Sequence, residues 1–401
     1  MKHLTFSDLF NEQDKGFLSQ AIEHTTEQEV ERALSREAQG GLADFTALLS
    51  PVAQKKFLEP MAQLSSRITQ RRFGNTIRLF APLYLSNECN NVCDYCGFSL
   101  GNDIARKTLS IPEMLREAGI LKQHGFEHVL LVTGESSRKV GTDYLAGALR
   151  TLRPHFANLS IEVQPLNTNE YRNLITEGLH AVMVYQETYD RESYAKHHLG
   201  GKKRNFEWRL ETPDRLGLAG VNKIGLGCLF GLTRDWRTDA YLAGLHLDYL
   251  EKRYWETTYS MSFPRIRPFE GETSPMVDLS DRDLVQLLCA FRIFKEELEL
   301  SISTRESPVF RENLLPLGVT TMSAGSKTNP GGYAGEEVSL EQFSISDERS
   351  PREVAGMLKE KGYDPVWKDW DSSYDLLGKT ENGLIPKVSS RKSLDTLSLA
   401  G

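Results

Sequence analysis

The composition of this 401-residue chain is that of a folded globular protein, with 39% hydrophobic and 26% charged residues. The formal charge of −7 argues against a broad cationic surface for nucleic acid. The first residues lack the apolar stretch of a signal peptide, and no run of about 18 apolar residues indicates a membrane span. We therefore expect a cytoplasmic protein whose partners are small molecules or proteins, with no nucleic acid and no membrane.

Residues 1–72 are expected to form an N-terminal helical extension. Thr26 and Glu29 fit a capping box, in which each side chain bonds to the backbone N–H of the other. The pair Gly40-Gly41 would end that helical segment. The pair Ser50-Pro51 would begin another, because serine caps a helix and proline fits its first turn.

Short apolar runs then alternate with helix-like segments along the chain. Eight runs have the character of buried strands: Ile77–Leu85, His128–Thr133, Leu159–Gln164, Ala181–Tyr185, Lys223–Leu229, Thr257–Phe263, Glu299–Thr304 and Val319–Ser323. Helix starts lie between them, for example at Ser110 with Glu113 as a capping box, at Thr212-Pro213 and near Ser280. This alternation implies parallel strands joined by right-handed crossovers.

The number of strand–helix units favours an α/β fold of the (β/α)8 TIM-type barrel over residues 73–370. An open doubly wound sheet produces the same local pattern and is the alternative. Beyond Asp371 the sequence becomes polar, so residues 371–401 are predicted to form a polar C-terminal tail.

Three of the five cysteines, Cys89, Cys93 and Cys96, directly follow the first predicted strand. A structural zinc site needs four closed ligands, and this loop has no obvious fourth one. A disulfide is disfavoured in the expected compartment, and inert cysteines rarely cluster. A [4Fe–4S] cluster held by three thiolates would leave one iron open to a chelating cosubstrate, and we favour this interpretation over the other two. Cys228 and Cys289 lie in apolar stretches and are expected in the core.

The cysteine loop has the form Cys-x3-Cys-x-aromatic-Cys, with Tyr95 as the aromatic residue. This loop resembles the signature of the radical S-adenosylmethionine superfamily. The resemblance implies that Cys89, Cys93 and Cys96 hold a [4Fe–4S] cluster whose open iron binds S-adenosylmethionine. The segment Thr133–Glu135, after the second predicted strand, is similar to the turn that meets the amino group of this cosubstrate.

Polar residues also follow the other predicted strands, and in a barrel such strand ends converge on one pocket. They include Gln164, Glu187, Arg265 and Arg305. Because arginine binds carboxylates in a bidentate manner, Arg209, Arg265 and Arg305 are candidates for holding a substrate or cosubstrate carboxylate. For Arg209, an ion pair with Glu211 is the alternative. The basic run Lys196–Arg204, with its two histidines, is expected to be a solvated loop without ligands.

Longer stretches are similar to one branch of the superfamily, the aromatic amino acid lyases, and within it to the tyrosine lyases of thiamine thiazole biosynthesis. The matching stretches are Pro82–Asn87, Leu131–Glu135, Tyr185–Tyr189, Arg209–Arg215, Ser303–Glu306 and Lys327–Tyr333. The resemblance implies radical cleavage of the tyrosine Cα–Cβ bond into 2-iminoacetate and 4-methylphenol, with S-adenosylmethionine converted to 5′-deoxyadenosine and methionine. The imine would supply the thiazole ring of thiamine.

The same resemblance implies roles for individual residues and partners. It places Arg305 on the substrate carboxylate, Tyr84 beside the substrate amino group and Glu135 on the amino group of the cosubstrate. Further and weaker matches are Ser323 among the catalytic residues, and Gln164, Glu187 and Arg209 among the cofactor-binding residues. The resemblance also implies thiazole synthase as a protein partner and a reductant of the flavodoxin or ferredoxin type.

Three alternatives remain open at this level. The tyrosine lyases of hydrogenase maturation share the barrel but carry a second cysteine motif in a C-terminal extension, whereas this chain has no cysteine after Cys289. A tryptophan lyase would differ in the shape of its pocket. A non-catalytic iron–sulfur or zinc protein that uses the barrel to bind other proteins would not cleave the cosubstrate.

Overall fold

Eight parallel strands form a closed barrel in the computed structural model, which describes residues 5–267, 278–335 and 341–370. The strands are β1 (Thr76–Ser86), β3 (His128–Thr133), β4 (Asn158–Glu162), β5 (Leu179–Met183), β7 (Lys223–Gly227), β8 (Thr258–Ser262), β9 (Glu299–Ile302) and β10 (Thr321–Ser323). All eight predicted runs are strands. The predicted tail at 371–401 lies outside the described residues.

The barrel closes between its first and last strands. Strand β1 pairs with β10 in parallel, with Arg78 opposite Thr321 and Phe80 opposite Ser323. The order around the ring is β1, β3, β4, β5, β7, β8, β9, β10. The predicted (β/α)8 barrel is therefore confirmed, and the open doubly wound sheet is wrong.

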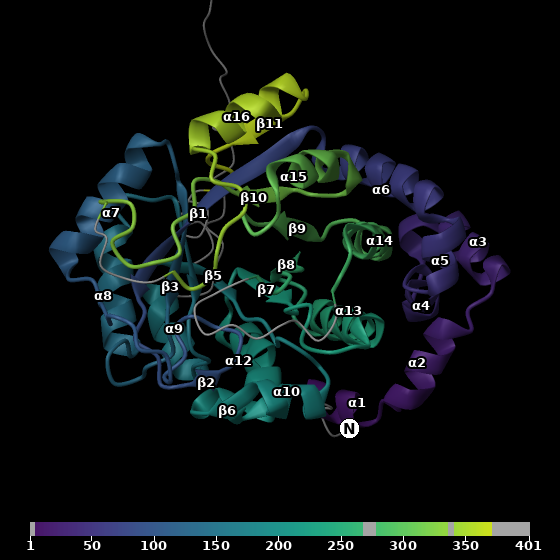
Figure 1. Cartoon of the computed structure of the whole chain (residues 1–401), viewed down its shortest axis with the longest axis horizontal. Helices are drawn as coiled ribbons and strands as arrows, with labels where there is room; N and C mark the ends of the chain where they lie inside the picture. Colours follow the sequence, from purple (N-terminus) through teal and green to yellow (C-terminus); the bar gives the residue numbers. More distant parts are fainter. Residues whose placement is uncertain (1–4, 268–277, 336–340, 371–401) are drawn as a thin grey trace, which may run out of the picture.

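Helices cover the outside of the barrel (Figure 1). They are α7 (Ile111–Gln123), α8 (Thr142–Leu152), α9 (Thr168–Thr176), α12 (Thr212–Ala219), α13 (Trp236–Arg253), α14 (Asp281–Phe294) and α15 (Pro308–Leu314). The predicted capping box of Ser110 and Glu113 begins α7, and Ser280 caps α14. Between β5 and β7 lie the short helices α10 (Arg191–His197) and α11 (Phe206–Leu210).

An N-terminal layer of helices lies outside α13 and α14 (Figure 1). It contains α1 (Phe6–Asn11), α2 (Lys15–Glu23), α3 (Glu27–Ser35), α4 (Leu42–Leu48), α5 (Pro51–Lys56) and α6 (Leu58–Phe73). Helix α14 is buried on all sides from Leu287 to Phe294, because it is covered by the barrel on one side and by this layer on the other. The layer and the barrel share one hydrophobic core. The boundary at residue 72 stays a prediction.

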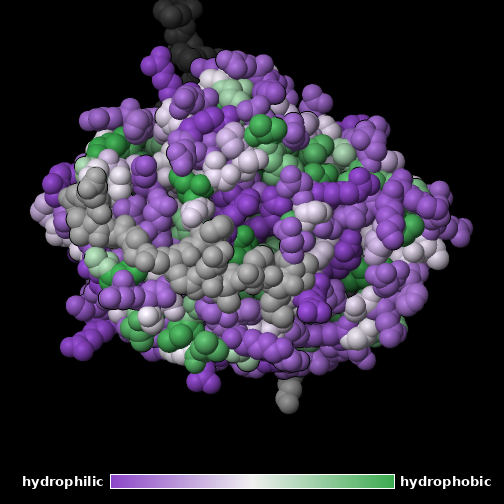
Figure 2. Space-filling view, in the orientation of Figure 1, coloured by the Kyte–Doolittle hydropathy of each residue, from purple (hydrophilic) through white to green (hydrophobic). Residues whose placement is uncertain are grey.

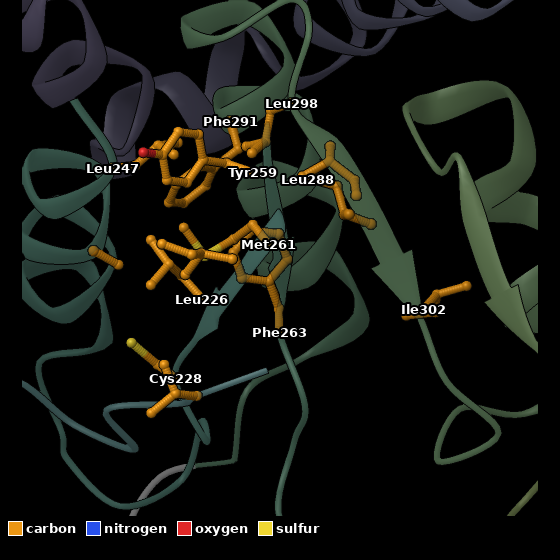
Figure 3. Packing of buried hydrophobic residues seen from close by; sticks show 14 of the residues in the cluster. Leu226, Cys228, Leu247, Tyr259, Met261, Phe263, Leu288, Phe291, Leu298 and Ile302 are labelled. Carbon is orange, nitrogen blue, oxygen red and sulfur yellow. The ribbon is translucent and has the colours of Figure 1, made fainter. Parts of the chain in front are cut away.

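The two cysteines outside the cysteine loop belong to this core. Cys228 and Cys289 are 1% and 0% exposed. Figure 3 shows Cys228 among buried hydrophobic side chains, near Leu226. Their predicted core position is confirmed. The face drawn in Figure 2 is mostly hydrophilic, with hydrophobic residues in small groups.

A short strand and an ion-pair cluster close the N-terminal end of the barrel. After α16 (Pro351–Glu360), strand β11 (Asp364–Val366) pairs with the start of β1. Asp369 then bonds to Arg78 and lies 2.7 Å from Nε2 of His128. Sequence reasoning missed β11, because three residues are too few to give a periodic signal.

We expect the Phe6→Ala variant to lose about 3–5 kcal/mol of unfolding free energy. The Phe6 ring is fully buried and stacks on His246 of α13, with ring centroids 3.6 Å apart. Urea denaturation followed by circular dichroism would measure the loss. Phe17→Ala is the matched control, because Phe17 is 68% exposed and its removal should change the stability little. Equal stability of the two variants would contradict this packing.

Candidate active site

A cavity opens at the C-terminal ends of the barrel strands. Each of the eight strands, or the loop that follows it, contributes to its wall. The cavity is open to solvent at its mouth. The predicted site residues that line it are Tyr84, Cys89, Cys93, Cys96, Glu135, Glu187, Arg209, Arg305 and Ser323.

The cysteine loop is held by hydrogen bonds to its backbone. Arg106 donates from Nη1 to the carbonyl oxygens of Asn87 (2.7 Å) and Phe98 (2.8 Å), and from Nη2 to that of Ser99 (2.7 Å). The backbone N–H of Cys93 donates to Oγ of Ser99 over 3.1 Å. The protein's own hydrogen bonds therefore define the shape of this loop.

A second segment fixes the same loop from outside. Strand β2 (Val92–Cys93) pairs antiparallel with β6 (His198–Gly200). The Tyr95 hydroxyl lies 2.7 Å from Nε2 of His198. Both histidines of this segment and Lys203 lie inside the protein, so the prediction that residues 196–204 form a solvated loop is wrong for them, whereas Lys196, Lys202 and Arg204 are exposed as predicted. For these three residues inside the protein the charge run was misleading, because their polar groups are paired there.

The three thiols of the loop supply the donor set of a cluster with three protein ligands. Cys89, Cys93 and Cys96 all line the cavity, and among the described residues its wall contains no other cysteine and no histidine. Burial raises the pKa of each thiol above its usual value. A bound metal would offset this cost, because it binds the thiolate form.

The turn after β3 packs directly against the cysteine loop. A Cβ atom on Gly134 would lie 2.8 Å from the Glu88 carbonyl carbon and 3.1 Å from Cβ of Cys89. A side chain at position 134 would therefore displace the backbone that carries the first cysteine. Only glycine allows so close an approach here.

We expect Gly134→Ala to lower the iron bound after anaerobic reconstitution to less than half of the wild-type content. Iron and sulfide analysis with the visible absorption spectrum would measure it. Gly147→Ala in α8 is the matched control, because a methyl group at position 147 would point into open space among the described residues. Full iron content in the Gly134 variant would show that this contact does not position the cysteine loop.

Two glutamates and two cations form a network on one wall of the cavity. Nη1 of Arg209 donates to Oε1 of Glu135 over 2.9 Å, and Nη2 lies 3.4 Å from Oε1 of Glu187. Lys203 donates from Nζ to the same Glu187 oxygen over 2.7 Å. Arg209 does not pair with Glu211, whose carboxylate accepts from Ser7. That alternative for Arg209 is wrong.

Glu135 and Glu187 are ionised in this network. Burial works against the charged form of Glu135, but Arg209 and Lys203 offset it and lower the pKa of this carboxyl below its usual value. The same two cations lower the pKa of Glu187 despite its burial. Glu187 also adopts φ = 70°, which is unusual for a residue with a side chain and is found mostly at functional sites.

Arg305 lies on the opposite side of the cavity, in the loop after β9. Its guanidinium stacks on Phe343 at 3.3 Å from the ring centroid, and its Nη1 lies 3.4 Å from the carbonyl oxygen of Arg265. Among the described residues no carboxylate lies within 4 Å of it, and burial lowers its pKa. A buried guanidinium of this kind favours an anionic ligand.

Tyr84 and Ser323 have defined hydrogen-bond partners beside the cysteine loop and Arg305. The Tyr84 hydroxyl donates to Oε1 of Gln342 over 2.7 Å, and its ring packs edge-on against Phe98. Oγ of Ser323 accepts from the backbone N–H of Thr304 over 3.1 Å. Both side chains therefore face the cavity in fixed positions.

Two other predicted residues lie elsewhere. Gln164 donates to the carbonyl oxygen of Val140 and lines a neighbouring hollow rather than the main cavity. That hollow shares Glu135, Lys203 and Arg209 with the main cavity. Arg265 is bound to Glu306 and Asp281, so the candidate role of Arg265 as a free carboxylate anchor is not supported by its contacts.

Sequence reasoning missed the cavity residues Asn91, Glu162, Lys203 and Gln342. For Glu162 a signal was present: alternate residues of β4 face the barrel interior, and Asn158, Ser160 and Glu162 follow this period of two. For Gln342, which lies 40 residues after β9 ends, the sequence carries no comparable signal. Only the fold brings it to Tyr84.

Comparison with curated proteins decides the family. The chain is 52% identical to 2-iminoacetate synthase of Escherichia coli (strain K12) over 368 residues, covering 92% of this chain and 97% of the relative. It is 51% identical to 2-iminoacetate synthase of Salmonella typhimurium, with the same coverage. The chain belongs to the 2-iminoacetate synthase family.

The family match agrees with the domain profiles and the fold. The sequence profile of the Radical SAM superfamily matches residues 83–242, and that of the Biotin and Thiamin Synthesis associated domain matches residues 262–364. The crystal structure of HydG, a maturase of the [FeFe]-hydrogenase, superposes with a TM-score of 0.85 at 29% identity, covering 90% of this chain and 81% of HydG. The sequence contains no long apolar run, and accordingly none of the described helices has the length and hydrophobicity that a membrane span requires.

Proposed function

We propose that this chain is a tyrosine lyase that cleaves the Cα–Cβ bond of tyrosine by radical chemistry. The products are 2-iminoacetate and 4-methylphenol, with S-adenosylmethionine reduced to 5′-deoxyadenosine and methionine, and the imine supplies the thiazole ring of thiamine. The observation that carries this function is the 52% identity to 2-iminoacetate synthase over nearly the full length of both chains. The sequence identity to HydG, the hydrogenase maturase, is lower, at 29%.

The cofactors are a [4Fe–4S] cluster and S-adenosylmethionine. When bound, they supply a carbon radical that removes a hydrogen atom from the substrate. Cys89, Cys93 and Cys96 would hold three irons of the cluster. Glu135, next to the cysteine loop and kept ionised by Arg209, would accept a hydrogen bond from the cosubstrate amino group.

The substrate would be held on the other side of the cavity. Arg305 would bind its carboxylate in a bidentate manner, and the Tyr84 hydroxyl would lie beside its amino group, with Ser323 close to both. Fixing these two groups determines which hydrogen faces the radical carbon. Such positioning provides selectivity, because a substrate free to turn would lose other hydrogens.

The partners implied by this function extend the proposal. We propose thiazole synthase as the acceptor of the imine, a flavodoxin or ferredoxin as the electron donor and the cytoplasm as the location. Anaerobic co-purification of the tagged chain with purified thiazole synthase would test the first of these. Absence of a complex at micromolar concentrations would reject a stable partnership.

The activity itself is tested by anaerobic reconstitution with iron and sulfide, followed by reaction with dithionite, S-adenosylmethionine and tyrosine. We expect 5′-deoxyadenosine and 4-methylphenol in comparable amounts by liquid chromatography and mass spectrometry. No 5′-deoxyadenosine would reject the radical reaction and favour a non-catalytic cluster protein. Products from tryptophan in place of 4-methylphenol would reassign the substrate.

A further inference from the structure

One carboxylate in the cavity has no partner among the described residues. Glu135 and Glu187 are both neutralised by Arg209 and Lys203. Glu162 also lines the cavity, yet within the described part of the chain no hydrogen bond or ion pair reaches its carboxylate. Glu162 is half-buried at the cavity wall. A ligand that fills the cavity would remove water from this carboxylate, which is costly unless the ligand donates to it.

Glu162 and Arg305 lie on opposite sides of the barrel. Glu162 is the last residue of β4, and Arg305 follows the end of β9 by three residues. In the ring of eight strands, β4 and β9 are separated by four steps in either direction. An eight-stranded barrel has an interior wide enough for one small ligand, so a molecule of that size can reach from one residue to the other.

The wall between these two residues carries apolar and aromatic side chains as well as the hydroxyl groups of Ser262 and Ser301. It includes Phe80, Leu130 and Met183, with Tyr185 beside them. A ligand that fits this arrangement carries an anionic group at Arg305, an apolar or aromatic middle and a hydrogen-bond donor at Glu162. Tyrosine has these three parts in this order.

We propose that Glu162 accepts a hydrogen bond from the phenolic hydroxyl of the substrate and thereby selects tyrosine over phenylalanine. This inference rests on the proposed function, because it assumes that tyrosine is the substrate. Phenylalanine in the cavity would displace water from Glu162 without supplying a donor, and a site built to bond a hydroxyl strongly rejects an analogue that lacks it.

The charge state of Glu162 is consistent with this role. Burial, together with the repulsion of Glu187, raises the pKa of Glu162 to about 7. Arg305 acts in the opposite direction and favours the ionised form. Both the ionised and the protonated form are thus present near neutral pH, and a donor from the ligand would stabilise the ionised form in place of the lost water.

The test compares wild type, Glu162→Ala, Glu162→Gln and the exposed control Glu360→Ala, all reconstituted anaerobically with S-adenosylmethionine present. For Glu162→Ala we expect the KM for tyrosine to rise at least tenfold, while iron content and the KM for S-adenosylmethionine stay within twofold of wild type. Glu162→Gln should stay within about fivefold, because its amide oxygen also accepts a hydrogen bond. Glu360→Ala should match wild type. An unchanged tyrosine KM in Glu162→Ala would overturn the inference.

A second measurement compares the binding of tyrosine and phenylalanine. Equilibrium dialysis of reconstituted wild type should give a Kd for phenylalanine at least tenfold above that for tyrosine, and Glu162→Ala should reduce this ratio to less than threefold. Equal affinities in the wild type would reject Glu162 as the selecting residue even if the variants fail to fold. If the wild type yields no 4-methylphenol from tyrosine, the proposed function is overturned. If it yields 4-methylphenol but Glu162→Ala has the same ratio of phenylalanine Kd to tyrosine Kd as the wild type, only this inference is overturned.

Discussion

Cys93→Ala is expected to lose the intact cluster and all turnover. Cys93 lies on the cavity wall between the other two cysteines in the sequence, and the described wall offers no histidine or fourth cysteine to replace it. A cube with two protein ligands is held too weakly to survive reconstitution and desalting. The measurements are iron and sulfide per chain, the absorption spectrum and the amount of 5′-deoxyadenosine formed with dithionite.

Cys228→Ala is the matched control for this experiment. Cys228 is buried in the hydrophobic core and is not part of the cysteine loop, so its removal should keep the iron content and the turnover of wild type. We expect a stability loss of about 1 kcal/mol from the small cavity that it leaves. Full activity of Cys93→Ala, or loss of iron in Cys228→Ala, would contradict the cluster assignment.

Arg305→Ala is expected to raise the KM for tyrosine by roughly 100-fold, while the KM for S-adenosylmethionine changes little. Loss of one partner from a buried charge pair costs about 2–5 kcal/mol, and each 1.4 kcal/mol corresponds to tenfold in affinity. The cosubstrate is less affected, because the network of Glu135 and Arg209 lies on the other wall. Initial rates of 4-methylphenol formation over a range of tyrosine concentrations measure the change.

Arg305→Lys separates charge from geometry at this position. Lysine keeps the positive charge but cannot bind a carboxylate with two parallel hydrogen bonds, so we expect a tyrosine KM between those of wild type and Arg305→Ala. A second readout is the ratio of 5′-deoxyadenosine to 4-methylphenol, which should rise in both variants, because a loosely held substrate uncouples the two products. A tyrosine KM equal to that of wild type in Arg305→Ala would remove Arg305 from the substrate site.

The strands were predictable because their information is local. The run at His128–Thr133 is apolar and bounded by polar segments, and the structure makes it β3 with the same ends. The helix start at Ser110 was equally clear, because its capping box is complete within four residues. In contrast, β11 contains three residues and pairs with β1 only because α16 carries it back to the start of the barrel.

Pairing between distant residues was not predictable from the sequence. Lys203 belongs to a basic run that resembles a solvated surface, yet its ammonium group binds Glu187 inside the cavity. Arg209 could equally have bonded to the nearby Glu211, but it bonds to Glu135 and Glu187. Which charged side chains form an ion pair depends on which of them are removed from water together in the fold. A local sequence pattern contains no information about that.

The three cysteines that follow the first strand are therefore the part of the site that could be located without the fold. The covalent chain sets their spacing within one loop. A loop that directly follows β1 in a barrel must lie at the C-terminal ends of the strands, where the loops after the other strands also meet. The polar groups that face those cysteines across the cavity are brought there by the folding of distant segments. The tertiary structure neutralised Glu135 and Glu187 with cations and left Glu162 and Arg305 without an ion-pair partner among the described residues, because closing the ring placed β4 and β9 on opposite sides.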